Sequence, residues 1–173
     1  MFARLHSSAT LLKQRGFSML EILITLVIIA TALLGTAGLQ IQAMRVSQSG
    51  QYRTQAVFLA SDIAERMEAN KAAAITGNYV VATASTPSTA TLDCSTNACD
   101  VAALAAWDIS QWENEIISLG LPQATWVITQ TATGNPSTYK IVINWNERRK
   151  NIQYSTTGST ELLSYTATRT VSN

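Results

Sequence analysis

Histidine and cysteine are scarce in this 173-residue sequence, which has one histidine, His6, and two cysteines, Cys94 and Cys99. A structural zinc site needs four nitrogen or sulfur ligands, so a region that offers two thiols and no histidine does not suit zinc. The sequence also lacks a Gly-x-Ser-x-Gly nucleophile motif, a glycine-rich phosphate loop and a His-Glu-x-x-His motif. We therefore expect no catalytic residues, no metal, no cofactor and no small-molecule substrate.

A strong excess of charge of one sign is missing as well. The formal net charge is +1, and three of the twelve basic residues, Arg4, Lys13 and Arg15, precede Phe17. The rest of the chain has nine basic and eleven acidic residues and is therefore slightly acidic. Because phosphate binding depends on clustered Lys and Arg, nucleic acid is not the expected partner.

One basic cluster is present, Arg148-Arg149-Lys150. It follows a predicted strand, and we interpret it as a solvated turn. Contact with a partner or a polyanion is the alternative interpretation of these three residues.

The two cysteines lie close together, with four residues between Cys94 and Cys99. We interpret them as a disulfide that closes a short loop, which places this part of the chain in an oxidising compartment. Two free thiols are the alternative.

The length of the chain suits one ordinary domain plus a membrane segment.

A long apolar run extends from Phe17 to Met44, and Glu21 is its only charged residue. As a helix this run would be about 42 Å long, more than the ~30 Å thickness of a bilayer's hydrocarbon core. An ionised carboxylate deep in a bilayer costs about 2 to 3 kcal/mol, so Glu21 calls for a partner. The basic segment 1–16 suits the cytoplasmic side of such a span.

A secretory signal peptide cut after Ala30-Thr31-Ala32 is the alternative interpretation of the apolar run. We disfavour it because the apolar residues continue well past Ala32. Cleavage there would leave an exposed apolar N-terminus, and Glu21 lies where a signal peptide requires apolar residues.

Helical periodicity continues after the apolar run. Apolar side chains recur at spacings of three and four residues, at Tyr52, Ala56, Leu59, Ile63 and Met67. We predict that one long helix serves first as membrane span and then as amphipathic core helix. It ends near Ile75-Thr76-Gly77-Asn78, where glycine and asparagine favour termination.

A second helix is predicted from Val101 to Leu119, with Asp100 as its N-cap and Gly120-Leu121-Pro122 as its stop. One stripe of this helix is apolar: Ala105, Ile109, Trp112, Ile116 and Leu119. We interpret Trp107 and Trp112 as packing residues. We interpret the acidic residues Asp108, Glu113 and Glu115 as a solvated face rather than an acid/base pair.

The last third of the chain changes to the period of a strand. Tyr139, Ile141, Ile143 and Trp145 alternate with more polar residues, which predicts one buried face. Other strands are predicted at 79–83, 124–132, 152–156 and 162–171, and a hairpin loop at 133–137. The resulting fold class is α+β, with the amphipathic half of the long helix packed on an antiparallel sheet of about four strands.

The segment Gly16-Phe17-Ser18-Met19-Leu20-Glu21, followed by the apolar run, resembles the class III signal of type IV pilins and of type II secretion pseudopilins. The resemblance implies that a prepilin peptidase cuts after Gly16 and methylates the new amino terminus of Phe17. It also implies a partner for Glu21, whose carboxylate would pair with the amino terminus of its own or a neighbouring subunit. The implied organisation is a cytoplasmic leader 1–16, a transmembrane and filament-core helix 17–44, and a periplasmic head 45–173.

More of the chain resembles the PilV family of minor pilins, the type IV pilus modification proteins. Three segments carry this resemblance: Leu34-Gly35-Thr36-Ala37-Gly38-Leu39-Gln40, Leu59 to Met67 with Ala69-Asn70, and Cys94 to Cys99 leading into Leu104-Ala105-Ala106-Trp107-Asp108 and Trp112. It implies the type IV pilin fold, single-pass insertion in the bacterial inner membrane, and later residence in a surface pilus with other minor pilins and the major pilin. The alternatives are a type II secretion pseudopilin, an adhesin or DNA receptor, and an anchored enzyme.

Overall fold

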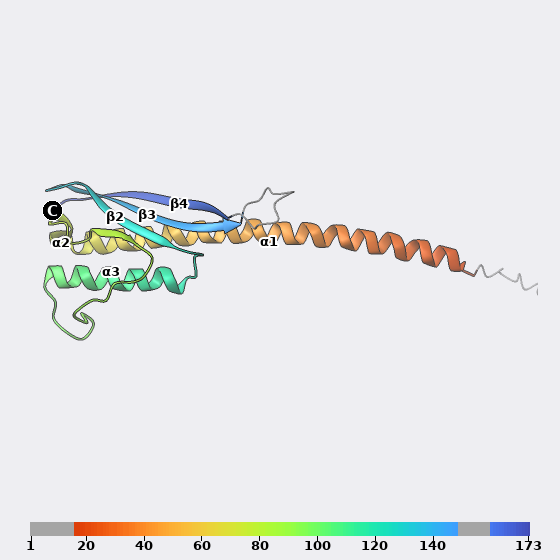
Figure 1. Cartoon of the computed structure of the whole chain (residues 1–173), viewed down its shortest axis with the longest axis horizontal. Helices are drawn as coiled ribbons and strands as arrows, with labels where there is room; N and C mark the ends of the chain where they lie inside the picture. The colour runs from red at the N-terminus through yellow and green to blue at the C-terminus, as the bar shows by residue number, and fades with distance from the viewer. Residues whose placement is uncertain (1–15, 149–159) are drawn as a thin grey trace, which may run out of the picture. The chain divides into compact units, whose positions relative to one another are not determined.

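The computed structural model describes residues 16–148 and 160–173, and it has the predicted α+β composition (Figure 1). The elements in chain order are α1 (Met19–Ala69), α2 (Lys71–Ile75), β1 (Val81–Ala84), α3 (Val101–Ser118), β2 (Thr125–Ala132), β3 (Ser137–Arg148) and β4 (Thr160–Val171). The chain divides into two compact units, one up to Arg45 and one from Val46 on. The second unit is called the head.

The first unit contains the apolar part of α1. Each described residue up to Arg45 is exposed, including the large apolar side chains. The hydroxyl groups of Thr25, Thr31 and Thr36 donate to backbone carbonyls of their own helix, at 2.8 to 3.1 Å. This part of α1 is long and apolar enough to cross a membrane, and its threonine hydroxyls need no partner outside the helix.

The head contains the amphipathic part of α1. The predicted stripe is confirmed, because Ala56, Leu59, Ile63 and Met67 are almost fully buried and Tyr52 packs against the same core. Burial of this stripe covers one face of the sheet, as the amphipathic pattern requires.

The predicted unbroken helix is wrong in one respect, because α1 ends at Ala69 and α2 begins at Lys71. Asn70 lies between them with φ −114° and ψ 57°, and its side-chain amide donates to the carbonyl of Val101 at 2.8 Å. Asparagine favours such local departures because its side chain competes with the helix for backbone partners.

The predicted stop after α2 is confirmed. Gly77 has φ 88°, a conformation that costs glycine little, and its N–H donates to Ala74 O at 3.2 Å. The N–H of Asn78 donates to Ala73 O at 3.0 Å, which completes a Schellman motif.

The sheet is antiparallel with strand order β1-β2-β3-β4, so four strands are present among the described residues. The predicted buried face of β3 is confirmed, because Tyr139, Ile141, Ile143 and Trp145 are all at most 1% exposed. Ile128 and Trp126 of β2 lie opposite Ile141 and Ile143 on that face. The strand predicted at 152–156 lies outside the described residues.

Helix α3 begins and ends close to its predicted limits. The carboxylate of Asp100 accepts the N–H of Ala103 at 2.7 Å, so the N-cap is confirmed. Ala105, Ile109, Trp112 and Ile116 are buried as predicted. The predicted burial of Leu119 is wrong, because this residue forms the C-cap and is 36% exposed.

Candidate functional site

The segment Gly16-Phe17-Ser18 immediately precedes α1 and is exposed, with Phe17 79% accessible to solvent. Ser18 caps the helix: its carbonyl accepts the N–H of Glu21 at 3.0 Å and its hydroxyl accepts the N–H of Leu20 at 3.3 Å. The peptide bond between Gly16 and Phe17 therefore lies just outside the helix, where it is accessible.

Glu21 lies in the first turn of α1, three residues after the capping Ser18. Ser18-Met19-Leu20-Glu21 has the Ser-x-x-Glu pattern of a capping box, a sequence signal for the start of this helix. A carboxylate in the first turn interacts favourably with the positive end of the helix dipole. Glu21 thus has a local role at the helix start, whatever other partner it has.

Cys94 and Cys99 form a disulfide, with their Cα atoms 5.6 Å apart, so the alternative of two free thiols is wrong. The Sγ atom of Cys94 also lies 3.8 Å from the carbonyl oxygen of Ala103 in α3. A disulfide sulfur carries no hydrogen, so this is a packing contact. The disulfide loop ends at Cys99, directly before the N-cap residue Asp100, and so restrains the chain at the start of α3.

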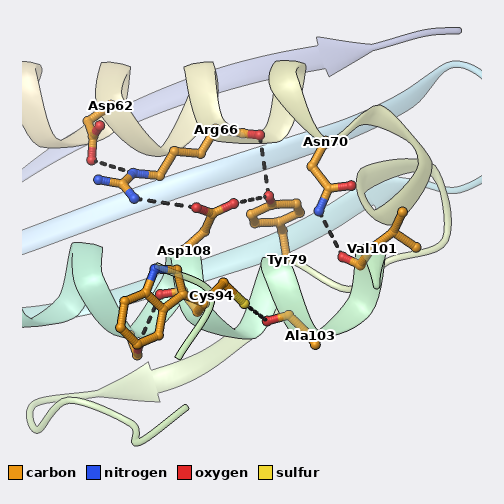
Figure 2. A network of polar contacts seen from close by, with 10 residues as sticks. Asp62, Arg66, Asn70, Tyr79, Cys94, Val101, Ala103 and Asp108 are labelled. Atoms are coloured by element: carbon orange, nitrogen blue, oxygen red, sulfur yellow. Dashed lines mark hydrogen bonds and ion pairs between the residues drawn. The ribbon is translucent and has the colours of Figure 1, made fainter. Parts of the chain in front are cut away.

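A network of polar side chains connects α1, α3 and the turn before β1 (Figure 2). Arg66 contacts Asp62 at 3.0 Å within α1 and Asp108 of α3 at 3.4 Å. The hydroxyl of Tyr79 lies 2.6 Å from the other carboxylate oxygen of Asp108 and 3.3 Å from the carbonyl of Arg66. Because a phenol has one hydrogen, we assign the donated bond to Asp108.

Burial and the charges of this network shift two pKa values. Burial raises the pKa of Tyr79, and the hydrogen bond to the negative Asp108 raises it further. Burial alone would lower the pKa of Arg66, but its contacts with Asp62 and Asp108 outweigh that effect and the pKa is raised. Both groups are therefore held in the protonated form, and both oxygens of Asp108 are engaged, which suits a structural role.

The prediction of a solvated acidic face on α3 is wrong for Asp108 and Glu113 and confirmed for Glu115. Glu113 is 1% exposed and accepts three hydrogen bonds, from the N–H and hydroxyl of Ser88 and from the indole of Trp126. Its distances to Ser88 N and to Trp126 Nε1 are 2.6 and 2.8 Å. Three donors replace the water that this carboxylate loses on burial.

The helical spacing contained a signal for Glu113. It lies four residues after Ile109 and three before Ile116, so it falls on the buried side of the helix beside Trp112. What the sequence could not reveal is the identity of the donors, which come from Ser88 and Trp126.

The two tryptophans of α3 differ in their surroundings. Trp112 is fully buried and its indole N–H donates to the carbonyl of Leu59 at 2.7 Å, which ties α3 to α1. Trp107 is half-buried and lines an open groove of about 410 Å³ between residues 87–90 and α3. The groove is lined by uncharged residues, among them Ser110 and Asn114, and offers no acid or base for chemistry.

The predicted partner-contact cluster is largely untested by the structure. Strand β3 extends to Arg148, whereas Arg149 and Lys150 lie outside the described residues. Within 16–148 and 160–173, no group of three His, Cys, Asp or Glu side chains could hold a metal ion.

Comparison with known proteins gave two adjacent matches. Residues 11–37 match the prokaryotic N-terminal methylation motif, and residues 38–110 match the Tt1218-like family, described as type IV pilin Tt1218. Neither a curated protein nor a solved structure matches the chain significantly. The matched family is structural rather than enzymatic. The two matches together cover residues 11–110, so this stretch is similar to type IV pilins with the prepilin methylation motif, and the helix-on-sheet fold is consistent with the type IV pilin fold.

Proposed function

We propose that this chain is a minor pilin of the PilV kind, which is inserted in the inner membrane and then joins other minor pilins to prime pilus assembly or cap the tip. The proposal rests chiefly on one observation. Glu21, the only charge between Phe17 and Met44, lies in the first turn of a helix that begins at Met19, two residues after Phe17. Cleavage of the Gly16-Phe17 bond would create an amino terminus close to the Glu21 carboxylate, and this amino group is a suitable partner for it.

The chemistry of processing supplies that partner. Cleavage after Gly16 would create an ammonium group at Phe17, and methylation would leave its charge in place. This cation would stand at the positive end of the α1 dipole, which is unfavourable without a nearby anion. An ion pair with Glu21 of the same or a neighbouring subunit lowers the cost of burying both groups.

Intact-mass analysis of the membrane-extracted protein tests the processing step. The expected mass is that of a chain starting at Phe17 with one added methyl group. A chain that starts after Ala32, or one that retains Met1, contradicts the proposal.

Replacement of Glu21 tests its role in assembly. Glu21→Gln keeps the size and capping ability of the side chain but removes the charge, so we expect normal cleavage and a loss of the subunit from sheared pili. Thr25→Val is the matched control, because the Thr25 hydroxyl is already bonded to Ile22 O at 2.8 Å in its own helix. Equal incorporation of Glu21→Gln and the unmodified protein would contradict the ion-pair role.

The second candidate is a minor pseudopilin of a type II secretion filament, because the methylation motif serves both assemblies. Deletion of the gene separates the two. Loss of surface pili and twitching with intact protein secretion supports the minor pilin, and loss of secretion with intact pili supports the pseudopilin.

The third candidate is a direct role in adhesion or DNA uptake, which depends on Arg148-Arg149-Lys150. We propose to replace all three by alanine. Normal piliation with reduced adhesion or uptake supports a partner contact at this cluster, and unchanged adhesion and uptake count against it.

A further inference from the structure

Strand β4 forms one edge of the sheet. It pairs with β3 along twelve residues, and no strand among the described residues pairs with its other side. Its middle, 162–168, contains no charge, proline or glycine. Edge strands of soluble proteins are usually short or protected by such residues, because their free N–H and C=O groups recruit another strand. The edge of β4 therefore has the properties of a strand-pairing surface.

The packing of β4 agrees with an incomplete sheet. Leu163, Tyr165 and Ala167 point to the core side but are only partly buried, whereas Ile141 and Ile143 of β3 on the same face are fully buried. The inner face of β3 is thus completely covered by the helices of the head, and that of β4 only partly. A strand added beside β4 would increase the burial of these three side chains.

The charges of β4 identify the strand that fits. Glu161 and Arg169 each lie four residues from Tyr165, in opposite directions. In an antiparallel pair of two β4 strands centred on Tyr165, Glu161 of each copy lies directly opposite Arg169 of the other. We propose that the edge of β4 pairs with β4 of a second copy of this chain, in a two-fold dimer with Tyr165 on the axis and a continuous eight-stranded sheet.

This register also relieves an unfavourable contact within each chain. Glu147 of β3 and Glu161 of β4 are directly opposite each other, and like charges in that position are destabilising. None of the ion pairs among the described residues involves either glutamate. Arg169 of the second copy would place a cation beside Glu161. Arg169 already contacts Glu68 at 3.1 Å, so it would then bridge two carboxylates.

The direction of the strands indicates where such a pair could form. In the head, β4 runs along α1, so a two-fold axis across β4 sets the head helices of the two copies antiparallel (Figure 1). Subunits of one filament that were inserted in one membrane point the same way. The dimer therefore joins heads that approach from opposite directions, such as those of two filaments. This last step rests on the proposed function, whereas the pairing of two heads does not.

Charge reversal tests the pairing. Sedimentation of the full chain in detergent should give a dimer for the unmodified protein and monomers for Glu161→Arg and Arg169→Glu, because each variant sets like charges opposite each other twice. An equimolar mixture of the two variants restores both ion pairs and should sediment as a dimer. Circular dichroism confirms that each variant is folded. Association that is the same in every variant, or a mixture that stays monomeric, overturns the proposal.

A cysteine on the axis tests the register independently. Directly opposite residues have Cα atoms about 4.5 to 5.5 Å apart, within disulfide range, whereas diagonal neighbours are about 7 to 8 Å apart. Oxidation should therefore link Tyr165→Cys to itself and leave the control Ser164→Cys unlinked. Equal linking of both, or of neither, contradicts the register. These measurements on purified protein can fail while processing and piliation remain normal, and the reverse also holds.

Discussion

The hydroxyl of Tyr79 lies 2.6 Å from a carboxylate oxygen of Asp108, although the two residues are 29 positions apart in the chain. The same carboxylate contacts Arg66, so one acidic group of α3 holds both α1 and the turn before β1 (Figure 2). This relationship explains why Asp108 is not on a solvated face. It also implies that removal of a single polar atom of this network lowers the stability of the head.

Removal of the Tyr79 hydroxyl should destabilise the head. Tyr79→Phe deletes the hydrogen bond to Asp108 and keeps the ring, so we expect a loss of about 1 to 2 kcal/mol in the free energy of unfolding. Tyr52→Phe is the control, because the Tyr52 hydroxyl accepts an exposed bond from Gln48 and its loss should cost less than about 0.5 kcal/mol. Denaturant titration of both variants makes the comparison, and equal losses would contradict the role of Asp108.

Alkaline pH should act through the same hydroxyl. The folded-state pKa of Tyr79 is raised above that of the unfolded chain, so its contribution to stability is complete below about pH 10 and is lost as the pH rises further. We expect the melting temperature to fall above pH 10 and to fall less in Tyr79→Phe. Parallel curves for the two proteins would show that Tyr79 is not the responsible group.

Replacement of the Glu113 carboxylate by an amide should destabilise the head. Glu113→Gln retains one acceptor oxygen but turns an NH2 group toward the donors of Ser88 or Trp126. We expect a loss of about 2 to 3 kcal/mol, because hydrogen bonds to a charged group are strong and a buried mismatch is costly. Amide hydrogen exchange at 87–90 should accelerate. The exposed Glu115→Gln serves as the control, and an equal effect in both variants would contradict the role of Glu113 as the acceptor for Ser88 and Trp126.

The sequence predicted the parts of the fold that depend on periodicity and local stop signals. Three features can be recognised from neighbouring residues alone: the alternation of Tyr139 to Trp145, the stripe of Ala56 to Met67 and the cap at Asp100. The break at Asn70 and the burial of Glu113 depend on Val101 and on Ser88 and Trp126. Such partners are distant in sequence, so periodicity does not reveal them.

The disulfide should contribute modestly to the stability of the head. Cys94 and Cys99 are five positions apart, and closing so short a loop restricts the unfolded chain by about 2 kcal/mol. We expect Cys94→Ser with Cys99→Ser to lower the melting temperature and to loosen the first turn of α3. A reducing agent should reproduce the shift in the unmodified protein and have no effect on the double variant. If reduction leaves the unmodified protein unchanged, the disulfide is not stabilising.

Two isoleucines of α1 should separate the roles of its two parts. Ile63 is fully buried in the head, so Ile63→Ala creates a cavity and should cost about 2 to 5 kcal/mol of head stability. Ile29 is 54% exposed in the apolar unit, so Ile29→Ala should leave the unfolding of the head unchanged. Because Ile29 contributes apolar surface to the span, its loss should instead weaken retention in the membrane or incorporation into the filament. Denaturant unfolding of the head and the amount of subunit in sheared filaments measure the two effects, and a change of head stability in Ile29→Ala would contradict this division of α1.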